Sequence, residues 1–509
     1  RLAAGVRSAP VEEPCDVGGG DLGDAVLGEV GGGVGVQEGE DGEFTASGFA
    51  LRPDVGLVLL DHLGEAGTGQ GLTHLHLDLH LIEDFVGELF GISGDVAGLR
   101  GRDSKFAPLY DCKRLFVQRY VTRAIKPDAV GAEPAVDVGA NPSDGVEAWE
   151  LAFAVKVRGL VGAEFKVDKP TPEVEALAKY AAWALHSPDG KRRHRDGPLF
   201  KVPHKLDFEH LVPIETEMVD GITRMKLPRP MLRHREGFAL TDEGFDAARA
   251  LDHANYCIWC HNQGKDSCSK GLKDRKTGAF QKSPFGVTLA GCPLEEKISE
   301  MNLLKSEGFS VGALAIAAVD NPLLAATGHR ICNDCMKACI YQKQEPVNIP
   351  QIETGALTDV LKMPWGVEIY GLLTRWNPLN VKRPYALPYN GRNILVVGLG
   401  PAGYTLSHYL LNEGFGVVAI DGLKIEPLPE AWTGSDTQPP QPLQAWSDIY
   451  RPLNERVLEG FGGVSEYGIT VRWDKNFLTL LHLTLARRSK LRIYGGIRFG
   501  GTLPLEDVW

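Results

Sequence analysis

The sequence predicts a multidomain fold in which an α-helical, cysteine-rich domain is followed by a partial, Rossmann-like α/β domain. The chain has 509 residues, more than the roughly 250–300 that a single hydrophobic core usually serves. Seven of its nine cysteines fall within residues 257–339. Further along, the apolar run Asn393–Val397 leads directly into a glycine-rich turn, which predicts a buried strand and a nucleotide-binding loop. These features predict four regions, at residues 1–72, 73–240, 241–375 and 390–509.

The first region, residues 1–72, is unusually rich in glycine, with 17 glycines among the first 70 residues. Because glycine loses the most conformational entropy on folding, we expect this region to be disordered, or to be translated from outside the true reading frame. An acidic interaction tail is the alternative, since residues 1–104 carry 19 Asp and Glu, five Arg and no Lys. The rest of the chain is close to neutral, so its charge predicts no nucleic-acid partner.

Residues 73–240 are expected to form a helical accessory region. Apolar residues recur at helical spacing over residues 81–90, 109–117 and 174–185. Before them, His74, His76 and His80 alternate with apolar residues, which favours a half-buried strand over a metal site. Cys112 is isolated and is interpreted as a core thiol. No apolar run approaches the roughly 18 residues of a membrane span, and no signal pattern opens the chain, so a cytoplasmic location is expected.

The region 241–375 opens with a helix over residues 245–254, which Thr241 is expected to cap and which delivers the chain to Cys257. The cysteines then follow at short spacing: Cys257, Cys260, Cys268, Cys292, Cys332, Cys335 and Cys339. Soft thiolates at such spacing suit iron–sulfur clusters or zinc. Seven thiolates leave two four-ligand sites one donor short. A zinc ribbon of Cys257, Cys260, Cys332 and Cys335 is the alternative, and it leaves the other three cysteines unexplained.

In the fourth region, a strand at Asn393–Val397, the turn GLGPAG, a helix over residues 404–413 and a strand at Gly416–Ile420 end at an acidic residue. This order is typical of dinucleotide binding: the glycines allow a tight turn and close approach of the pyrophosphate, and the acid accepts the ribose hydroxyls. The expected cofactor residues are therefore Gly398, Gly400, Pro401, Ala402, Gly403 and Asp421. Geometry alone does not distinguish FAD from NAD(P).

The cysteine pattern, with Pro293 after Cys292 and the segment 346–353 after the last cysteine, resembles the iron–sulfur domain of the glutamate synthase small (β) subunit, a domain that also opens dihydropyrimidine dehydrogenase. The resemblance implies two [4Fe–4S] clusters, with Glu353 as the missing eighth donor. It assigns one cluster to Cys257, Cys260, Cys268 and Cys339, and the other to Cys292, Cys332, Cys335 and Glu353. The chain departs from this pattern in residues 269–291, which look inserted.

The same resemblance implies FAD at the GLGPAG turn, and it places a later segment near the flavin, with Gly463, Tyr467, Gly468, Ile469 and Arg472. It covers residues 246–509 and leaves the FAD domain incomplete at the C-terminus, without the NAD(P)H-binding domain. The implied function is an oxidoreductase module that moves electrons between NAD(P)H, FAD and the clusters to an electron-acceptor protein or domain. Its catalytic residues are not assigned. The alternatives are a non-catalytic iron–sulfur and flavin scaffold and a zinc-ribbon interaction protein.

Overall fold

A computed structural model describes the chain from residue 108 to residue 508, except residues 196, 203–204, 233–235, 238, 241–243, 328–331, 436 and 461–473. It also describes the backbone of two short N-terminal strands, β1 (Gly35–Glu38) and β2 (Phe44–Ser47), which pair antiparallel. The helix expected at residues 81–90 and the histidines at 74, 76 and 80 lie outside the described residues.

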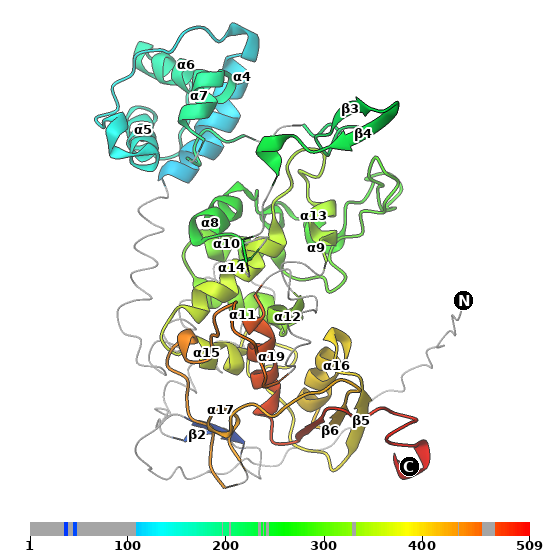
Figure 1. Ribbon diagram of the computed structural model, residues 1–509. Helices are drawn as coiled ribbons and strands as arrows, with labels where there is room; N and C mark the ends of the chain where they lie inside the picture. Colours follow the sequence, from blue (N-terminus) through cyan, green and yellow to red (C-terminus); the bar gives the residue numbers. More distant parts are fainter. Residues whose placement is uncertain are drawn as a thin grey trace.

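The accessory region is a small helical unit with its own core, at the top of Figure 1. The π-helix η1 (Cys112–Val121) continues into α4 (Thr122–Ala124), and it packs against α5 (Val146–Val161) and α6 (Pro172–His186). The helices expected near residues 109–117 and 174–185 are therefore present. Thr171 caps α6, because its hydroxyl accepts the Val174 N–H at 3.3 Å. Cys112 is fully buried in this core.

Shorter elements complete the accessory region. They are η2 (Pro127–Ala129), η3 (Pro142–Asp144), α7 (Pro188–Arg193), β3 (Glu215–Val219), β4 (Ile222–Lys226) and η4 (Arg229–Met231). Strands β3 and β4 form an antiparallel hairpin that projects from the body of the molecule (Figure 1).

The cysteine region is helical, as its sequence pattern predicts. Its elements are α8 (Ala247–Tyr256), η5 (Cys260–Gln263), α9 (Ser267–Lys270), α10 (Ile298–Ser306), α11 (Ser310–Asp320), α12 (Leu324–Thr327), α13 (Asp334–Ala338), α14 (Ile349–Leu361) and α15 (Gly366–Leu373). The apolar helix α11 is buried along its length between α10 and α14. Asp246 caps α8, because its carboxylate accepts the Arg249 N–H at 2.7 Å. This N-cap lies five residues after Thr241, the predicted one.

The last region contains a three-stranded parallel sheet in the order β5–β6–β7. Strands β5 (Asn393–Val397) and β6 (Gly416–Ile420) have the bounds that the sequence predicts, and β7 (Leu491–Tyr494) extends the sheet beyond β6. Helix α16 (Pro401–Asn412) joins β5 to β6 and packs on both strands. Short elements follow β6 and end the chain: α17 (Glu430–Thr433), η6 (Trp446–Asp448) and α20 (Leu505–Val508).

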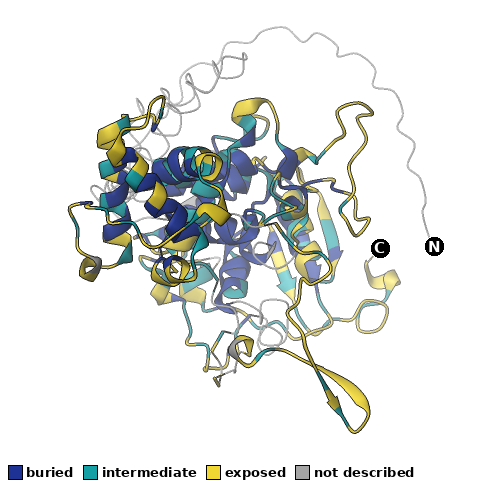
Figure 2. Ribbon diagram, turned by 90° about the horizontal axis from the view of Figure 1, so that it is seen from above, coloured by how far each residue is buried: buried dark blue, intermediate teal, exposed yellow. Residues whose placement is uncertain are grey.

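Helix α19 (Asn476–Ala486) joins the sheet to the cysteine region. Phe477, Leu480 and Leu483 pack into the core of the cysteine helices, whereas Leu481 and Leu485 pack into the core of the sheet. In Figure 1, α19 runs between the cysteine helices and the sheet. Figure 2 shows the buried residues concentrated in the helices at the centre of the molecule. Just past its C-terminal end, the Arg487 guanidinium bonds both carboxylate oxygens of Glu368 in α15, at 2.9 and 2.7 Å.

None of the helices in the described part of the chain is both long and apolar enough to span a membrane.

Candidate metal and cofactor sites

Four of the predicted ligands lie together at the ends of short helices. Cys257 ends α8, Cys260 begins η5, Cys268 lies in α9 and Cys339 ends α13; we call them the first group. Each is at most 7% exposed. The pKa of Cys257 is raised to about 12, mainly by burial and in smaller part by the neighbouring Cys339 and Cys260. Burial also raises the pKa of Cys268, as do Asp266, Cys257 and Cys339. The four thiols therefore lie close enough for electrostatic interactions within the group.

The backbone around the first group directs N–H groups at sulfur. Trp259, between the first two cysteines, has a left-handed conformation with φ of 49°, which is uncommon for a residue other than glycine. This turn brings the Trp259 N–H to 3.4 Å from the Cys257 sulfur. Burial raises the pKa of Cys339, and the backbone N–H groups of Tyr341 and Val347 act in the opposite direction. Such donors stabilise a thiolate in a buried site.

The accessory region contacts this turn directly. The Arg114 guanidinium lies 4.3 Å from the centre of the Trp259 ring, and the Lys113 ammonium forms a largely buried salt bridge of 2.7 Å with Asp252 of α8. A cation over an indole ring is a favourable contact, so the accessory region helps to hold the strained turn.

The other four predicted ligands form a second group, which is more open. Cys335 in α13 and Glu353 in α14 are buried, Cys292 is half-buried and Cys332 is exposed. Burial raises the pKa of Cys335, and Glu353, Cys332 and Cys292 contribute in the same direction. Burial and the charge of Glu296 raise the pKa of Cys292 to about 11, although the backbone N–H groups of Glu296 and Leu294 act in the opposite direction.

Glu353 belongs to a small buried polar cluster. One of its carboxylate oxygens accepts the Asn321 side-chain N–H at 2.7 Å. Burial, and the nearby Glu296, raise the pKa of Glu353 well above its usual range. Glu296 is also buried and also bonded to Asn321, and burial raises its pKa to about 7. The sequence interpretation missed Glu296 and Asn321, because neither stands at a recognisable spacing from a cysteine.

The two groups are joined by a close backbone contact. The Cys292 N–H donates to the carbonyl of Cys268 at 2.8 Å. The preceding residue, Gly291, has φ of 84°, and a Cβ there would lie 2.5 Å from the backbone nitrogen of Gly271. Glycine is thus required for the approach.

The donor set consists mostly of thiols, which are the ligands that iron–sulfur clusters take. In the described residues, no three His, Cys, Asp or Glu side chains converge closely enough to hold one metal ion. The zinc-ribbon set is also divided, since Cys257 and Cys260 belong to the first group and Cys332 and Cys335 to the second. A cubane distributes its ligands over separate iron atoms, so its thiolates stand further apart than on one zinc ion. Seven thiols and one carboxylate supply the eight donors that two four-ligand clusters need.

The glycine-rich turn after β5 has the features that a pyrophosphate needs. Gly398 has φ of 93°, and a Cβ on Gly403 would lie 1.8 Å from the Gly398 carbonyl oxygen, so both positions require glycine. A Cβ on Gly400, by contrast, would meet no atom within 4 Å, and the space beside it is open. Pro401 and Ala402 begin α16, whose N-terminus carries the partial positive charge of the helix dipole.

Asp421, at the end of β6, also contacts this turn. Its carboxylate accepts the Leu399 N–H and the Leu423 N–H, each at 2.7 Å. A carboxylate has about four acceptor positions, so it can still accept ribose hydroxyls while it fixes the loop. The sequence did not indicate this second role. The remaining predicted flavin contacts, Gly463, Tyr467, Gly468, Ile469 and Arg472, lie outside the described residues.

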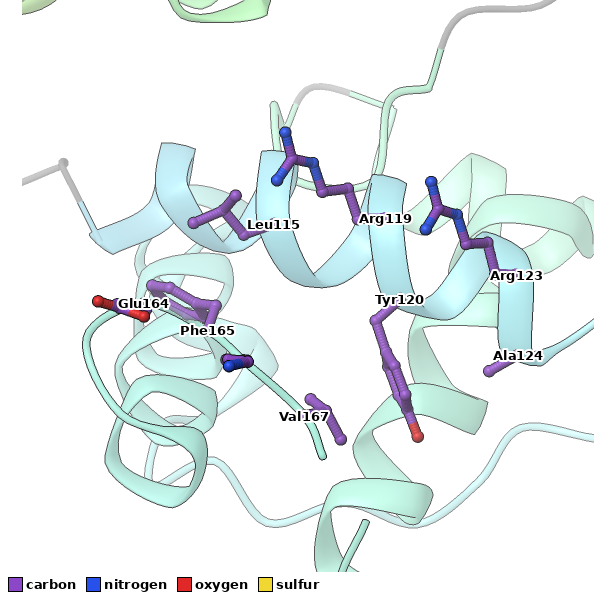
Figure 3. A pocket seen from close by; sticks show the side chains of 9 residues that line it. Leu115, Arg119, Tyr120, Arg123, Ala124, Glu164, Phe165 and Val167 are labelled. Atoms are coloured by element: carbon purple, nitrogen blue, oxygen red, sulfur yellow. The ribbon is translucent and has the colours of Figure 1, made fainter. Parts of the chain in front are cut away.

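A separate cavity of about 600 Å³ lies in the accessory region and includes none of the predicted ligands. Its lining combines η1 and α4 with residues 164–167. In Figure 3, Arg119 and Arg123 leave one side of the helix and Tyr120 points to the other side. The two arginines are exposed, so the cavity is an open surface feature.

The sequence was compared with known proteins. No model of a known protein family matches it. It is 54% identical over 186 residues to the uncharacterized protein RP006 of Rickettsia prowazekii (strain Madrid E), a match that spans 36% of this chain and 25% of that protein. It is also 30% identical over 249 residues to the uncharacterized protein RP005 of the same organism, which spans 46% of this chain and 79% of that protein. The chain thus spans a quarter of one relative and most of the other.

Proposed function

The chain belongs to the family of the uncharacterized protein RP005 of Rickettsia prowazekii, and from its own residues we propose that it is an oxidoreductase module of the glutamate synthase small-subunit type. The observation that carries this proposal is the arrangement of seven thiols and Glu353 in two groups, with backbone N–H groups directed at sulfur. When bound, FAD would exchange hydride with NAD(P)H, and two [4Fe–4S] clusters would carry single electrons to an acceptor protein.

The chain's own residues hold and orient these groups. The first group is buried and would hold its cluster away from water, whereas the half-buried Cys292 and exposed Cys332 open the second group to the surface. Asn321 holds one oxygen of Glu353 and leaves the other for a metal. The turn at Gly398 and the N-terminus of α16 offer N–H groups to a pyrophosphate. Because the two groups are joined through Cys268 and Cys292, their clusters would be close neighbours.

The test is the visible spectrum and iron content of the full chain, purified without oxygen. We expect a broad brown absorbance, flavin bands and about eight iron atoms per chain. Glu353→Ala is expected to remove about half of the iron, and Cys268→Ser the other half. Glu175→Ala is the matched control, because that exposed side chain lies on α6 of the accessory region, away from the predicted ligands.

A colourless protein that contains zinc would contradict the proposal and favour a zinc-binding interaction protein. Iron and flavin that NADPH and NADH both fail to reduce would instead favour a scaffold. Unchanged iron in Glu353→Ala would exclude that residue as a ligand.

A further inference from the structure

Residues 270–290, which we call the arm, leave the body between Cys268 and Cys292. The arm has a defined antiparallel backbone: Leu289 donates to the Gln281 carbonyl at 2.9 Å, and Gln281 donates to the Leu272 carbonyl at 2.8 Å. Further bridges join Lys273 to Phe280. It projects from the cysteine region in Figure 1, where it is drawn in bright green beside α9. The arm therefore has a hydrogen-bonded backbone of its own and is not an irregular loop.

The arm is strongly basic. Its exposed cationic side chains are Lys270, Lys273, Arg275, Lys276 and Lys282. Its only acid is Asp274, whose carboxylate is engaged within the arm by the N–H groups of Lys276 and Thr277. No salt bridge to any of the five cations is found among the described residues. Their charges remain available to a partner.

Apolar side chains stand among these charges. Phe280, Phe285 and Val287 are 42%, 62% and 45% exposed. The Lys273 ammonium lies 5.2 Å from the centre of the Phe280 ring, and the Phe285 ring meets Phe208 edge to face at 5.8 Å. A protein interface typically combines apolar or aromatic anchors with a polar rim, and this surface has both.

We propose that the arm is the docking surface for an acidic electron-acceptor protein, an inference that rests on the proposed function. Opposite charge steers such partners together and fixes their orientation. The arm ends at Cys292 of the second group, which is the group that reaches the surface. A partner on the arm thus lies beside the open group. An anionic membrane or a nucleic acid would not accept electrons, so neither would need to lie beside the second group.

The test uses the full chain, loaded with iron, and an acidic plant-type [2Fe–2S] ferredoxin as the probe in a kinetic binding assay. One variant reverses three charges of the arm: Arg275→Glu, Lys276→Glu and Lys282→Glu. The matched control reverses three exposed lysines of the accessory region that form no salt bridge among the described residues: Lys169→Glu, Lys179→Glu and Lys191→Glu. A third variant, Phe285→Ser, removes the most exposed ring.

We expect the arm variant to lower the association rate about tenfold or more at low salt, and added salt to weaken wild-type binding. The control should bind like the wild type, and Phe285→Ser should dissociate about fivefold faster. Equal association rates of the arm variant and its control with the ferredoxin would overturn the docking proposal. So would wild-type protein that binds anionic vesicles or single-stranded RNA but does not bind the ferredoxin. Iron content and visible spectrum of the same samples separate these results from failure of the proposed function, which would appear as a colourless chain.

Discussion

Gly291→Ala tests the contact on which the relation between the two cysteine groups depends. The residue has φ of 84°, and an alanine forced into this left-handed conformation costs about 1–2 kcal/mol. The new Cβ would also lie 2.5 Å from the Gly271 nitrogen and 2.7 Å from the Ser269 carbonyl oxygen. Both are backbone atoms, so the segments must separate. Separation breaks the hydrogen bond from Cys292 to Cys268, which contributes about 1 kcal/mol.

The expected loss is therefore about 2–4 kcal/mol of unfolding free energy, together with iron from the second group. Gly278→Ala is the matched control: its φ is 69°, yet its Cβ would meet no atom within 4 Å, so it should lose only about 1 kcal/mol. Urea unfolding under anaerobic conditions gives the stability, and an iron assay gives the occupancy. Equal losses in the two variants would refute the steric argument. A destabilised Gly291→Ala that keeps all its iron would separate the backbone contact from cluster binding.

Three further predictions concern other parts of the chain. Gly403→Ala should abolish flavin binding and destabilise the sheet by at least about 2 kcal/mol, because its Cβ would lie 1.8 Å from the Gly398 carbonyl oxygen; flavin released by heat and urea unfolding measure the two effects, and retained flavin would contradict it. Burial lowers the pKa of His408 from 6.5 to about 3, so the folded state keeps it neutral: stability present above pH 6.5 should fall by about 2 kcal/mol between pH 7 and pH 5, and His408→Leu should flatten this part of the profile. Lys113→Met should lower the unfolding free energy by about 3 kcal/mol, because it leaves the Asp252 carboxylate without its partner; full recovery in a Lys113→Met/Asp252→Leu double variant would assign the loss to the unpaired charge, and persistence would refute it.

Much of the fold was predictable where one local rule dominates. The bounds of β5 and β6 follow from continuous apolar runs that end at glycine or an acid. Burial of β6 on both faces accounts for its run, whereas β5 is an edge strand that is only partly buried. The helix α6 follows from apolar residues at helical spacing. The N-cap of α8 was misplaced by five residues, because Thr241 and Asp246 are both good N-caps and only packing decides between them.

For the candidate sites, the sequence predicts ligand residues but does not predict their surroundings. Thiol spacing predicts the cysteine ligands, and the family resemblance divides them, with Glu353, into two groups; this division stays a prediction. Asn321 lies 32 residues before Glu353 in the sequence, and Glu296 lies further away still. No local sequence pattern connects either residue with Glu353. The left-handed backbone conformation of Trp259 was not predictable from the sequence either, because a bulky residue gives no indication of a positive φ.

The shared helix α19 has a consequence for how the protein can be divided. Residues 241–375 and 390–509 look separable in sequence, yet each core uses a different face of this helix. A fragment that ends before residue 476 would expose the apolar surface that Phe477, Leu480 and Leu483 now cover. Expression of the cysteine region alone should therefore yield aggregated material, whereas a fragment that retains α19 remains compact. Unfolding of the two regions is expected to be a single cooperative event.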